Sequence, residues 1–251
     1  MTDRVIGLDV SRWQDNPYTP QEIDFVKARE NGTDFVFIRA GLDNTVDINF
    51  ADAWRDAKKA GLLRGSYWYY DYRFNAWAQS QKYIGTLDGD YGELPLVVDL
   101  EKKRGTKYPN RMAYLVGIKD FLEGLELHIS DNHSIMIYLN RGLINYLKPI
   151  PEWLLAYDLW IAWYPNAWAR LRNRQPKVSP WKRYTLWQHT DRADGHAYGM
   201  ESRQVDENYF NGSWEELQNY ATHISIEPPT PQPPTELTNQ EKLDRLWEMH
   251  Q

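Results

Sequence analysis

Short apolar segments rich in β-branched and aromatic residues recur along most of the chain, which is the pattern of buried strands. The predicted strands are Val5–Ser11, Phe35–Gly41, Gly65–Tyr72, Leu94–Glu101, Ser134–Asn140, Leu159–Tyr164 and Tyr184–His189. Between them, apolar residues recur at helical spacing in Ile23–Asn31, Phe50–Ala60 and Arg111–Glu123. Gly32 and Gly61 directly follow two of these segments, where helices commonly end.

This alternation of strand and helix predicts an α/β fold with a mainly parallel sheet, because parallel neighbours are joined by crossover helices. The number of units favours closure of the sheet into a (β/α) barrel. In such barrels the catalytic groups lie at the carboxyl-terminal ends of the strands. Residues at the predicted strand ends are therefore the first candidates for a functional site.

The amino-acid composition of the chain changes at residue 225. Residues 225–236 contain the run Glu-Pro-Pro-Thr-Pro-Gln-Pro-Pro-Thr, which is typical of an extended, semi-rigid linker. Residues 237–251 open with a capping box and carry apolar residues on one helical face. We expect a barrel over residues 1–224, a linker over 225–236 and a short helix over 237–251, which either docks on the barrel or mediates self-association or attachment.

The charge and hydropathy of the chain exclude some classes of partner. Its formal net charge is -6, whereas a protein whose main partner is nucleic acid usually presents a basic face. No apolar run approaches the ~20 residues of a membrane span, so we expect no membrane insertion. The first residues lack the pattern of a signal peptide, and we expect the protein to be made in the cytoplasm.

The sequence offers no metal or cofactor motif. It contains no Cys, which excludes disulfides and a thiol nucleophile. Its six His residues show no paired ligand spacing, and no Gly-rich loop of the phosphate-binding kind is present. We therefore expect a site that works without a metal or a cofactor.

Asp99 and Glu101 end the apolar run Leu94–Glu101. Side chains two residues apart on a strand share one face, which would set the two Cα atoms ~7 Å apart. Two acids on one face are what glycoside hydrolysis requires, and their charges should push their pKa values apart. A solvated strand end is the simpler interpretation of one such pair, so the rest of the chain must decide.

Two further acids and many aromatic residues fall at the same level of the predicted barrel. Asp9 ends the first strand, and Asp206 lies in the segment Gln204–Phe210, where the chain turns toward its last part. The chain has 12 Trp and 17 Tyr against 7 Phe, and Trp and Tyr can stack on a sugar while keeping a polar edge. The aromatic residues at this level are Tyr67, Trp68, Tyr69, Tyr138, Trp160, Trp163, Tyr164 and Trp187.

Taken together, these segments resemble the lysozymes of glycoside hydrolase family 25, which are N-acetylmuramidases. The matching motifs occur in the family's order: Gly7–Gln14, Phe35–Gly41, Gly65–Tyr69, Val98–Glu101, Ile137–Tyr138, Leu159–Tyr164, Leu186–Gln188 and Val205–Phe210. The chain departs from the family pattern at Trp68, where His is common, at Trp163, and at Glu207, where an aliphatic residue is usual.

The resemblance implies a distorted or incomplete (β/α) barrel that cleaves the β-1,4 bond between N-acetylmuramic acid and N-acetylglucosamine in bacterial peptidoglycan. Many members of the family are phage endolysins. With no signal peptide in view, the resemblance favours a phage or prophage endolysin that reaches the wall after holin-type release, or an enzyme carried on a phage particle. The alternatives are a non-catalytic glycan-binding module and a hydrolase of chitin-like polymers.

Carried onto this chain, the resemblance makes Glu101 the general acid/base. Asp99 would stabilise the developing positive charge or orient the substrate's N-acetyl group, and Asp9 and Asp206 would hydrogen-bond the pair or act as structural caps. Arg39 would pair with one of these acids or form a structural salt bridge. The expected substrate-binding residues are Tyr67, Tyr69, Tyr138, Trp160, Tyr164, Trp187 and Arg39.

Two basic stretches follow predicted strand ends. One runs from Lys102 to Arg111, and the other, Arg170–Arg183, contains six Lys or Arg residues. A locally positive rim on an acidic protein would guide an anionic wall polymer to the mouth of the barrel. A solvated loop of mixed charge is the alternative for each stretch.

Overall fold

The computed structural model describes residues 4–16, 18–102, 106–107, 109–129, 133–172 and 174–222. The proline-rich linker predicted at 225–236 and the helix predicted at 237–251 lie outside these residues, as does the middle of the basic stretch that begins at Lys102.

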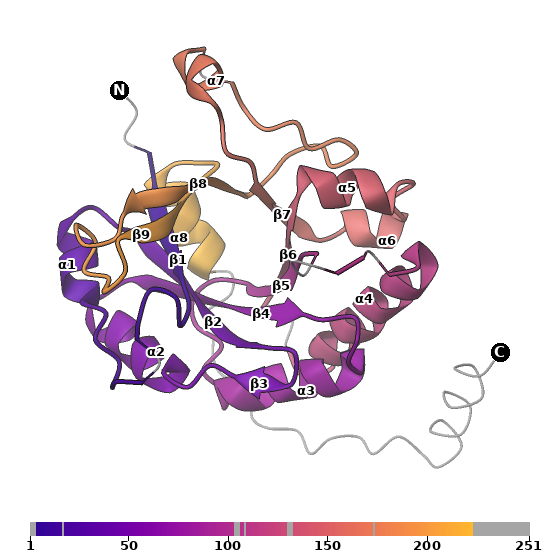
Figure 1. Ribbon diagram of the computed structural model, residues 1–251, viewed down its shortest axis with the longest axis horizontal. Helices are drawn as coiled ribbons and strands as arrows, with labels where there is room; N and C mark the ends of the chain where they lie inside the picture. The colour runs from indigo at the N-terminus through magenta and orange to yellow at the C-terminus, as the bar shows by residue number, and fades with distance from the viewer. Residues whose placement is uncertain are drawn as a thin grey trace.

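Within the described part of the chain, eight strands close into a barrel (Figure 1), in the order β1-β2-β4-β5-β6-β7-β8-β9. Their bounds are β1 Ile6–Val10, β2 Phe35–Leu42, β4 Leu63–Tyr70, β5 Leu96–Leu100, β6 Ile135–Asn140, β7 Asp158–Ala162, β8 Leu186–Asp194 and β9 Gln204–Phe210. A two-residue strand, β3 (Thr45–Val46), pairs with the end of β2. The predicted barrel is confirmed.

The barrel is distorted by its last strand. Of the eight barrel strands, those from β1 to β8 each run parallel to the next one, but β9 runs antiparallel to both β8 and β1. No crossover helix separates β8 from β9, so the two strands form a hairpin. The sequence prediction did not identify Gln204–Phe210 as a strand. Because β9 is reversed, it begins at the end of the barrel where the parallel strands finish.

Three helices correspond to the predicted ones, namely α1 (Phe25–Glu30), α2 (Phe50–Lys59) and α4 (Arg111–Glu126). The others were not predicted: α3 Ala76–Leu87, α5 Arg141–Leu147, α6 Glu152–Leu155, α7 Ala167–Leu171 and α8 Trp214–Thr222. Asn side chains cap several helix starts by accepting backbone N–H bonds, as Asn110 does at α4 and Asn140 at α5. These caps fix the residue at which each helix begins.

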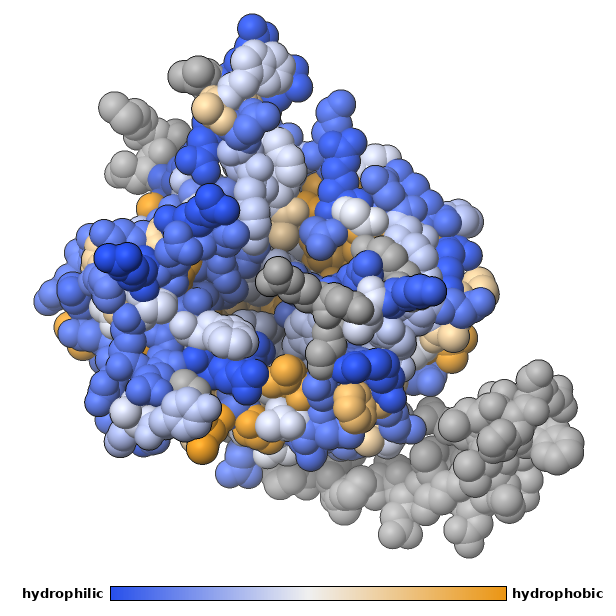
Figure 2. Space-filling model, in the orientation of Figure 1, coloured by the Kyte–Doolittle hydropathy of each residue, from blue (hydrophilic) through white to orange (hydrophobic). Residues whose placement is uncertain are grey.

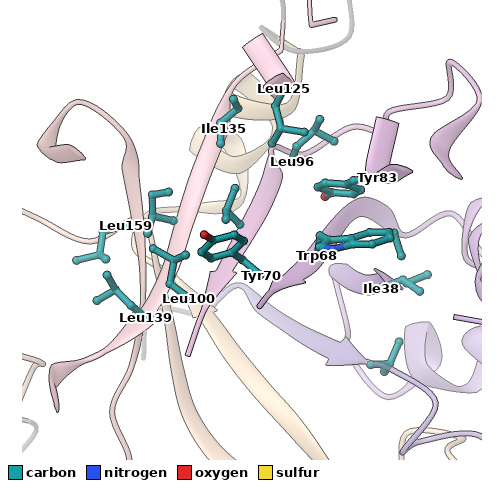
Figure 3. Packing of buried hydrophobic residues seen from close by; sticks show 14 of the residues in the cluster. Ile38, Trp68, Tyr70, Tyr83, Leu96, Leu100, Leu125, Ile135, Leu139 and Leu159 are labelled. Atoms are coloured by element: carbon teal, nitrogen blue, oxygen red, sulfur yellow. The ribbon is translucent and has the colours of Figure 1, made fainter. Parts of the chain in front are cut away.

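Alternate residues of each strand face two separate apolar layers. The outward side chains pack against the helices, as Trp68 does against Tyr83 with ring centroids 5.6 Å apart (Figure 3). The inward side chains fill the barrel. Phe35 and Phe37 occupy its closed end, where a Cβ at Gly7 would stand 2.1 Å from the Phe35 ring.

Helix α8 covers this closed end. Its Leu217 and Ala221 belong to the inner apolar layer, and the Tyr220 hydroxyl donates to Asp158 Oδ2 at the start of β7 (2.7 Å). The apolar filling stops at the opposite end, where the inward positions become polar. That end is the mouth of the barrel.

Candidate active site

A cavity of about 360 Å³ opens at the mouth. The four predicted catalytic acids, Asp9, Asp99, Glu101 and Asp206, line it together. A fifth acid that was not predicted, Asp191, lies at its edge on β8. The structure therefore brings together residues that are up to two hundred positions apart in the sequence.

Strand register explains why the acids meet. Asp9 on β1 is directly opposite Asp206 on β9, and Asp99 on β5 is opposite Tyr69 on β4 and Tyr138 on β6. Asp9 and Asp99 lie near strand ends, and Glu101 directly follows the end of β5, as predicted. Asp206 instead lies near the start of β9, and it reaches the mouth because that strand is antiparallel.

Asp9 is the acceptor of a buried hydrogen-bond network. Its Oδ2 accepts bonds from Gln188 Nε2 (2.9 Å) and Asn208 Nδ2 (2.7 Å). Burial raises the pKa of Asp9, while these bonds and one from Asp206 act to lower it. Burial, followed by the charge of Asp9, raises the pKa of Asp206 to about 9. At neutral pH, Asp206 therefore keeps its proton and donates it in a hydrogen bond to Asp9.

Asp99 and Glu101 form the second acidic pair. Burial, followed by the charge of Glu101, raises the pKa of Asp99 well above its usual range, and Arg39 opposes that shift. Burial also raises the pKa of Glu101, while the nearby Tyr138 hydroxyl acts to lower it. The buried Asp99 Oδ1 has no hydrogen-bond partner among the described residues. The pair thus combines two acids of raised pKa with one unpartnered acceptor oxygen in the same cavity.

Gln188 links the acids to the aromatic wall and was not predicted as a site residue. Its Oε1 accepts bonds from the hydroxyls of Tyr138 (2.9 Å) and Tyr164 (2.6 Å), while its Nε2 donates to Asp9. The predicted strand Tyr184–His189 contained the signal, because Gln188 shares the inward face with Leu186. A buried polar residue on an otherwise apolar face points to a function.

The aromatic residues make the floor and one wall of the cavity. Tyr67, Tyr69, Tyr138, Trp160 and Tyr164 line it, as predicted. Trp160 forms the floor, with its ring centroid 4.9 Å from that of Tyr138 and 6.4 Å from that of Tyr67. Its Nε1 donates to Asn208 Oδ1 (2.8 Å), which joins the floor to the network around Asp9.

Trp187, also expected to bind substrate, does not line the cavity. It faces outward from β8, stacks on Trp163 with centroids 5.6 Å apart, and donates from Nε1 to the Trp163 carbonyl (2.7 Å). Trp68, another aromatic residue expected at the mouth, faces the helices and is fully buried. Both corrections follow from strand alternation, since the residues on either side of each Trp are the inward ones.

Arg39 lines the cavity but pairs with none of the four acids. Its Nε and Nη2 donate to the two carboxylate oxygens of Asp47, at 2.8 and 3.2 Å, and both side chains are buried. Of the two predicted alternatives, the structural salt bridge is the one observed. The guanidinium still acts on the site, because its charge lowers the pKa of Asp99.

The loop after β1 supplies three cavity residues that were not predicted, namely Ser11, Trp13 and Gln14. Trp13 is 69% exposed at the rim, and the Arg12 guanidinium lies over its ring, 5.1 Å from the centroid. The rule that function lies just past the strand ends would have found this loop, as it found Asp9. Among the residues that the structure describes, no group of three or more His, Asp or Glu is placed to hold a metal ion, and no helix is long and apolar enough to cross a membrane.

The chain matches one protein-family model and an Escherichia coli relative. The family model described as glycosyl hydrolases family 25 matches residues 8–196. The Escherichia coli (strain K12) protein described as uncharacterized protein YegX is 32% identical over 228 residues, which cover 88% of this chain and 75% of that protein.

Solved structures share the fold. A bacterial lysozyme from Streptomyces coelicolor has a TM-score of 0.72 and 23% identity, over 90% of this chain and 100% of that chain. The CTP1L endolysin has a TM-score of 0.60 and 20% identity, over 86% of this chain and 69% of that chain. At these identities the likeness demonstrates a common architecture.

Proposed function

Because the chain belongs to family 25 of the glycosyl hydrolases, we propose that it is a lysozyme acting on bacterial peptidoglycan. The family resemblance expected from the sequence motifs is confirmed, and the chain is a glycoside hydrolase. Its proposed target is the β-1,4 bond between N-acetylmuramic acid and N-acetylglucosamine. The shared architecture with the bacterial lysozyme from Streptomyces coelicolor supports this choice of substrate.

One observation carries the proposal: Asp99 and Glu101 line the same cavity, where burial raises the pKa of both acids and the buried Asp99 Oδ1 has no hydrogen-bond partner among the described residues. In the proposed reaction, Glu101 gives a proton to the glycosidic oxygen as its bond to the anomeric carbon breaks. Asp99 Oδ1 accepts a hydrogen bond from the acetamido N–H of the sugar, whose carbonyl oxygen attacks the anomeric carbon. A substrate N–H at this position would also stabilise the ionised form of Asp99.

The second half of the reaction restores the enzyme. Glu101, now ionised, takes a proton from water as the water oxygen attacks the anomeric carbon and the acetamido group is released. The network of Gln188, Tyr138 and Asp9 holds the walls of the cavity in place during both steps, so little reorganisation is needed.

The products of digestion test the proposal. Purified peptidoglycan is digested, the new ends are reduced with borohydride, and the fragments are identified by mass. Ends in reduced N-acetylmuramic acid are expected. Ends in reduced N-acetylglucosamine would overturn the proposed bond, and cleavage of chitin oligosaccharides but not of peptidoglycan would overturn the proposed substrate.

A pair of variants tests the assignment of Glu101. Glu101→Gln should lose turnover by about 10²–10⁴-fold while its circular dichroism spectrum stays unchanged. Glu123→Gln, on the outer surface of α4, is the matched control and should retain full activity. If the folded Glu101→Gln protein lysed walls normally, Glu101 would not be the general acid. Retention of wild-type protein on walls that stay intact would favour a non-catalytic binding module.

We further propose an endolysin role, from a phage or prophage, because a solved endolysin has the same architecture. The enzyme would reach the wall after release by a membrane-permeabilising protein, or as part of a phage particle. Expression inside a bacterium, with and without a coexpressed holin, tests this role. Lysis that requires the holin is expected, and lysis without it would contradict assisted release.

A further inference from the structure

The segment that joins β7 to β8, described over residues 163–172 and 174–185, projects from the barrel (Figure 1), and we call it the β7–β8 arm. It starts at the mouth, since Tyr164 lines the cavity, and it carries α7 and the exposed Trp168. Trp168 follows Tyr164 by four residues, so their Cα atoms are at most ~14 Å apart. A polymer that leaves the cavity on this side meets the arm within a few sugar units.

The arm is strongly basic in an acidic chain. From Leu159 to Thr190 the sequence has no Asp or Glu, and Arg170–Arg183 holds six Lys or Arg residues, against a net charge of -6 overall. In the space-filling view the arm is mainly hydrophilic (Figure 2). The cavity, in contrast, is lined by five acids. Negative groups on a bound polymer are thus attracted by the arm and not by the cavity.

The tip of the arm combines cations with an aromatic face. The guanidinium groups of Arg172 and Arg174 lie over the Trp168 ring, 4.6 and 4.3 Å from its centroid, and the Trp168 side chain is 48% exposed. Neither Arg pairs with a carboxylate in the described part of the chain. Guanidiniums stacked on the indole keep their N–H edges available for bidentate binding of carboxylates.

The root of the arm is anchored to the site. Trp163 stacks on Trp187, its N–H donates to the Gln188 carbonyl (3.1 Å), and the Tyr164 hydroxyl donates to Gln188 Oε1. Asn166 then caps α7 by accepting from the Ala169 N–H (2.9 Å). Because the root is fixed by these bonds, the tip is held near the mouth.

We propose that the β7–β8 arm binds the carboxylate-bearing peptide stems of the glycan strand that occupies the cavity. Naming this polymer rests on the proposed function. The arm acts in substrate retention: its guanidiniums bind stem carboxylates on sugars outside the cavity, and those bonds hold the strand while other sugars occupy the cavity.

Binding without turnover tests the arm independently of the reaction. Glu101→Gln protein is sedimented with purified walls from which phosphate polymers have been removed, and the bound fraction is compared with that of Arg172→Gln/Arg174→Gln in the same background. The arm variant should bind roughly tenfold more weakly. It should bind like its parent to walls whose carboxyls have been amidated. Lys27→Gln/Lys148→Gln, which removes two exposed charges elsewhere, should bind like its parent on both walls.

Several outcomes would overturn the inference. Equal binding by the arm variant and its parent would show that the arm does not retain the wall. An equal loss on native and amidated walls would show that carboxylates are not what the arm binds, and an equal loss in the Lys variant would show a nonspecific charge effect. A defect that appears only before phosphate polymers are removed would assign the arm to those polymers. Product analysis of the unmutated enzyme decides the proposed function separately.

Discussion

Asp206 lies directly opposite Asp9 across the antiparallel strands β9 and β1, and the two carboxyl groups share one proton. Asp9 takes the role of the charged acceptor because Gln188 and Asn208 donate to it. Asp206 takes the role of the neutral donor because it is buried beside that charge. The two acids are thus not interchangeable, although their sequence contexts gave no reason to separate them.

Substitution by Asn should distinguish the two roles in turnover. Asp206→Asn keeps a donor toward Asp9, and kcat should stay within about threefold of the wild-type value. Asp9→Asn leaves the amides of Gln188 and Asn208 without a charged acceptor, and kcat should fall by about 10²-fold. Steady-state kinetics on soluble glycan strands checks both values, and equal losses in the two variants would contradict the shared proton.

The stability of Asp206→Asn should depend on pH. The folded protein raises the pKa of Asp206 from 3.8 to about 9, so the folded state binds the proton more tightly than the unfolded state. The free energy of unfolding of the wild-type protein therefore falls as the pH rises from 3.8 toward about 9. Asn removes that loss, and the variant should be more stable at pH 8 by on the order of 1–2 kcal/mol, with little gain near pH 4. Urea unfolding at both pH values measures the difference, and a gain that did not grow with pH would refute the prediction.

Tyr138→Phe should move the alkaline limit of activity upward. The Tyr138 hydroxyl acts to lower the pKa of Glu101, so its removal raises that pKa and keeps the general acid protonated to higher pH. The measurement is the pH profile of kcat. Tyr164→Phe, which removes the other hydroxyl on Gln188 Oε1, is the control and should leave the limit where it is.

The Arg39–Asp47 pair should behave as a buried ion pair. Removing either partner leaves a buried charge, so Arg39→Gln and Asp47→Asn should each destabilise the fold by about 3–5 kcal/mol. The double variant should lose less than the sum of the two, because neither charge remains. Thermal unfolding of the four proteins forms the cycle, and strict additivity would show that the two side chains do not interact.

Trp187 and Trp160 should differ in what their loss affects. Trp187→Leu removes an outward packing residue, so the melting temperature should fall while KM stays unchanged. Trp160→Phe alters the floor of the cavity and removes the donor to Asn208, so KM should rise by about tenfold. A raised KM in Trp187→Leu would mean that the outer layer also shapes the mouth.

The sequence predicted the barrel and its catalytic end because strand periodicity and strand-end acids are local signals. Segment Gln204–Phe210 escaped recognition as a strand because its inward residues, Asp206 and Asn208, are polar and blur the alternation. Trp187 was misplaced because residue type was read without the direction of the side chain. Gln188 was missed because its importance lies in a network of residues from distant strands, which register brings together and the sequence does not show.

The reversal of β9 also decides on which side the polypeptide leaves the enzyme. A parallel last strand would deliver the chain to the substrate-binding end, whereas β9 carries it back to the closed end, where α8 packs. An enzyme tethered to a bead, a particle or a fused protein through a linker after residue 222 would therefore face its substrate with an unobstructed entrance. The architecture therefore suits attachment through the closed end of the barrel.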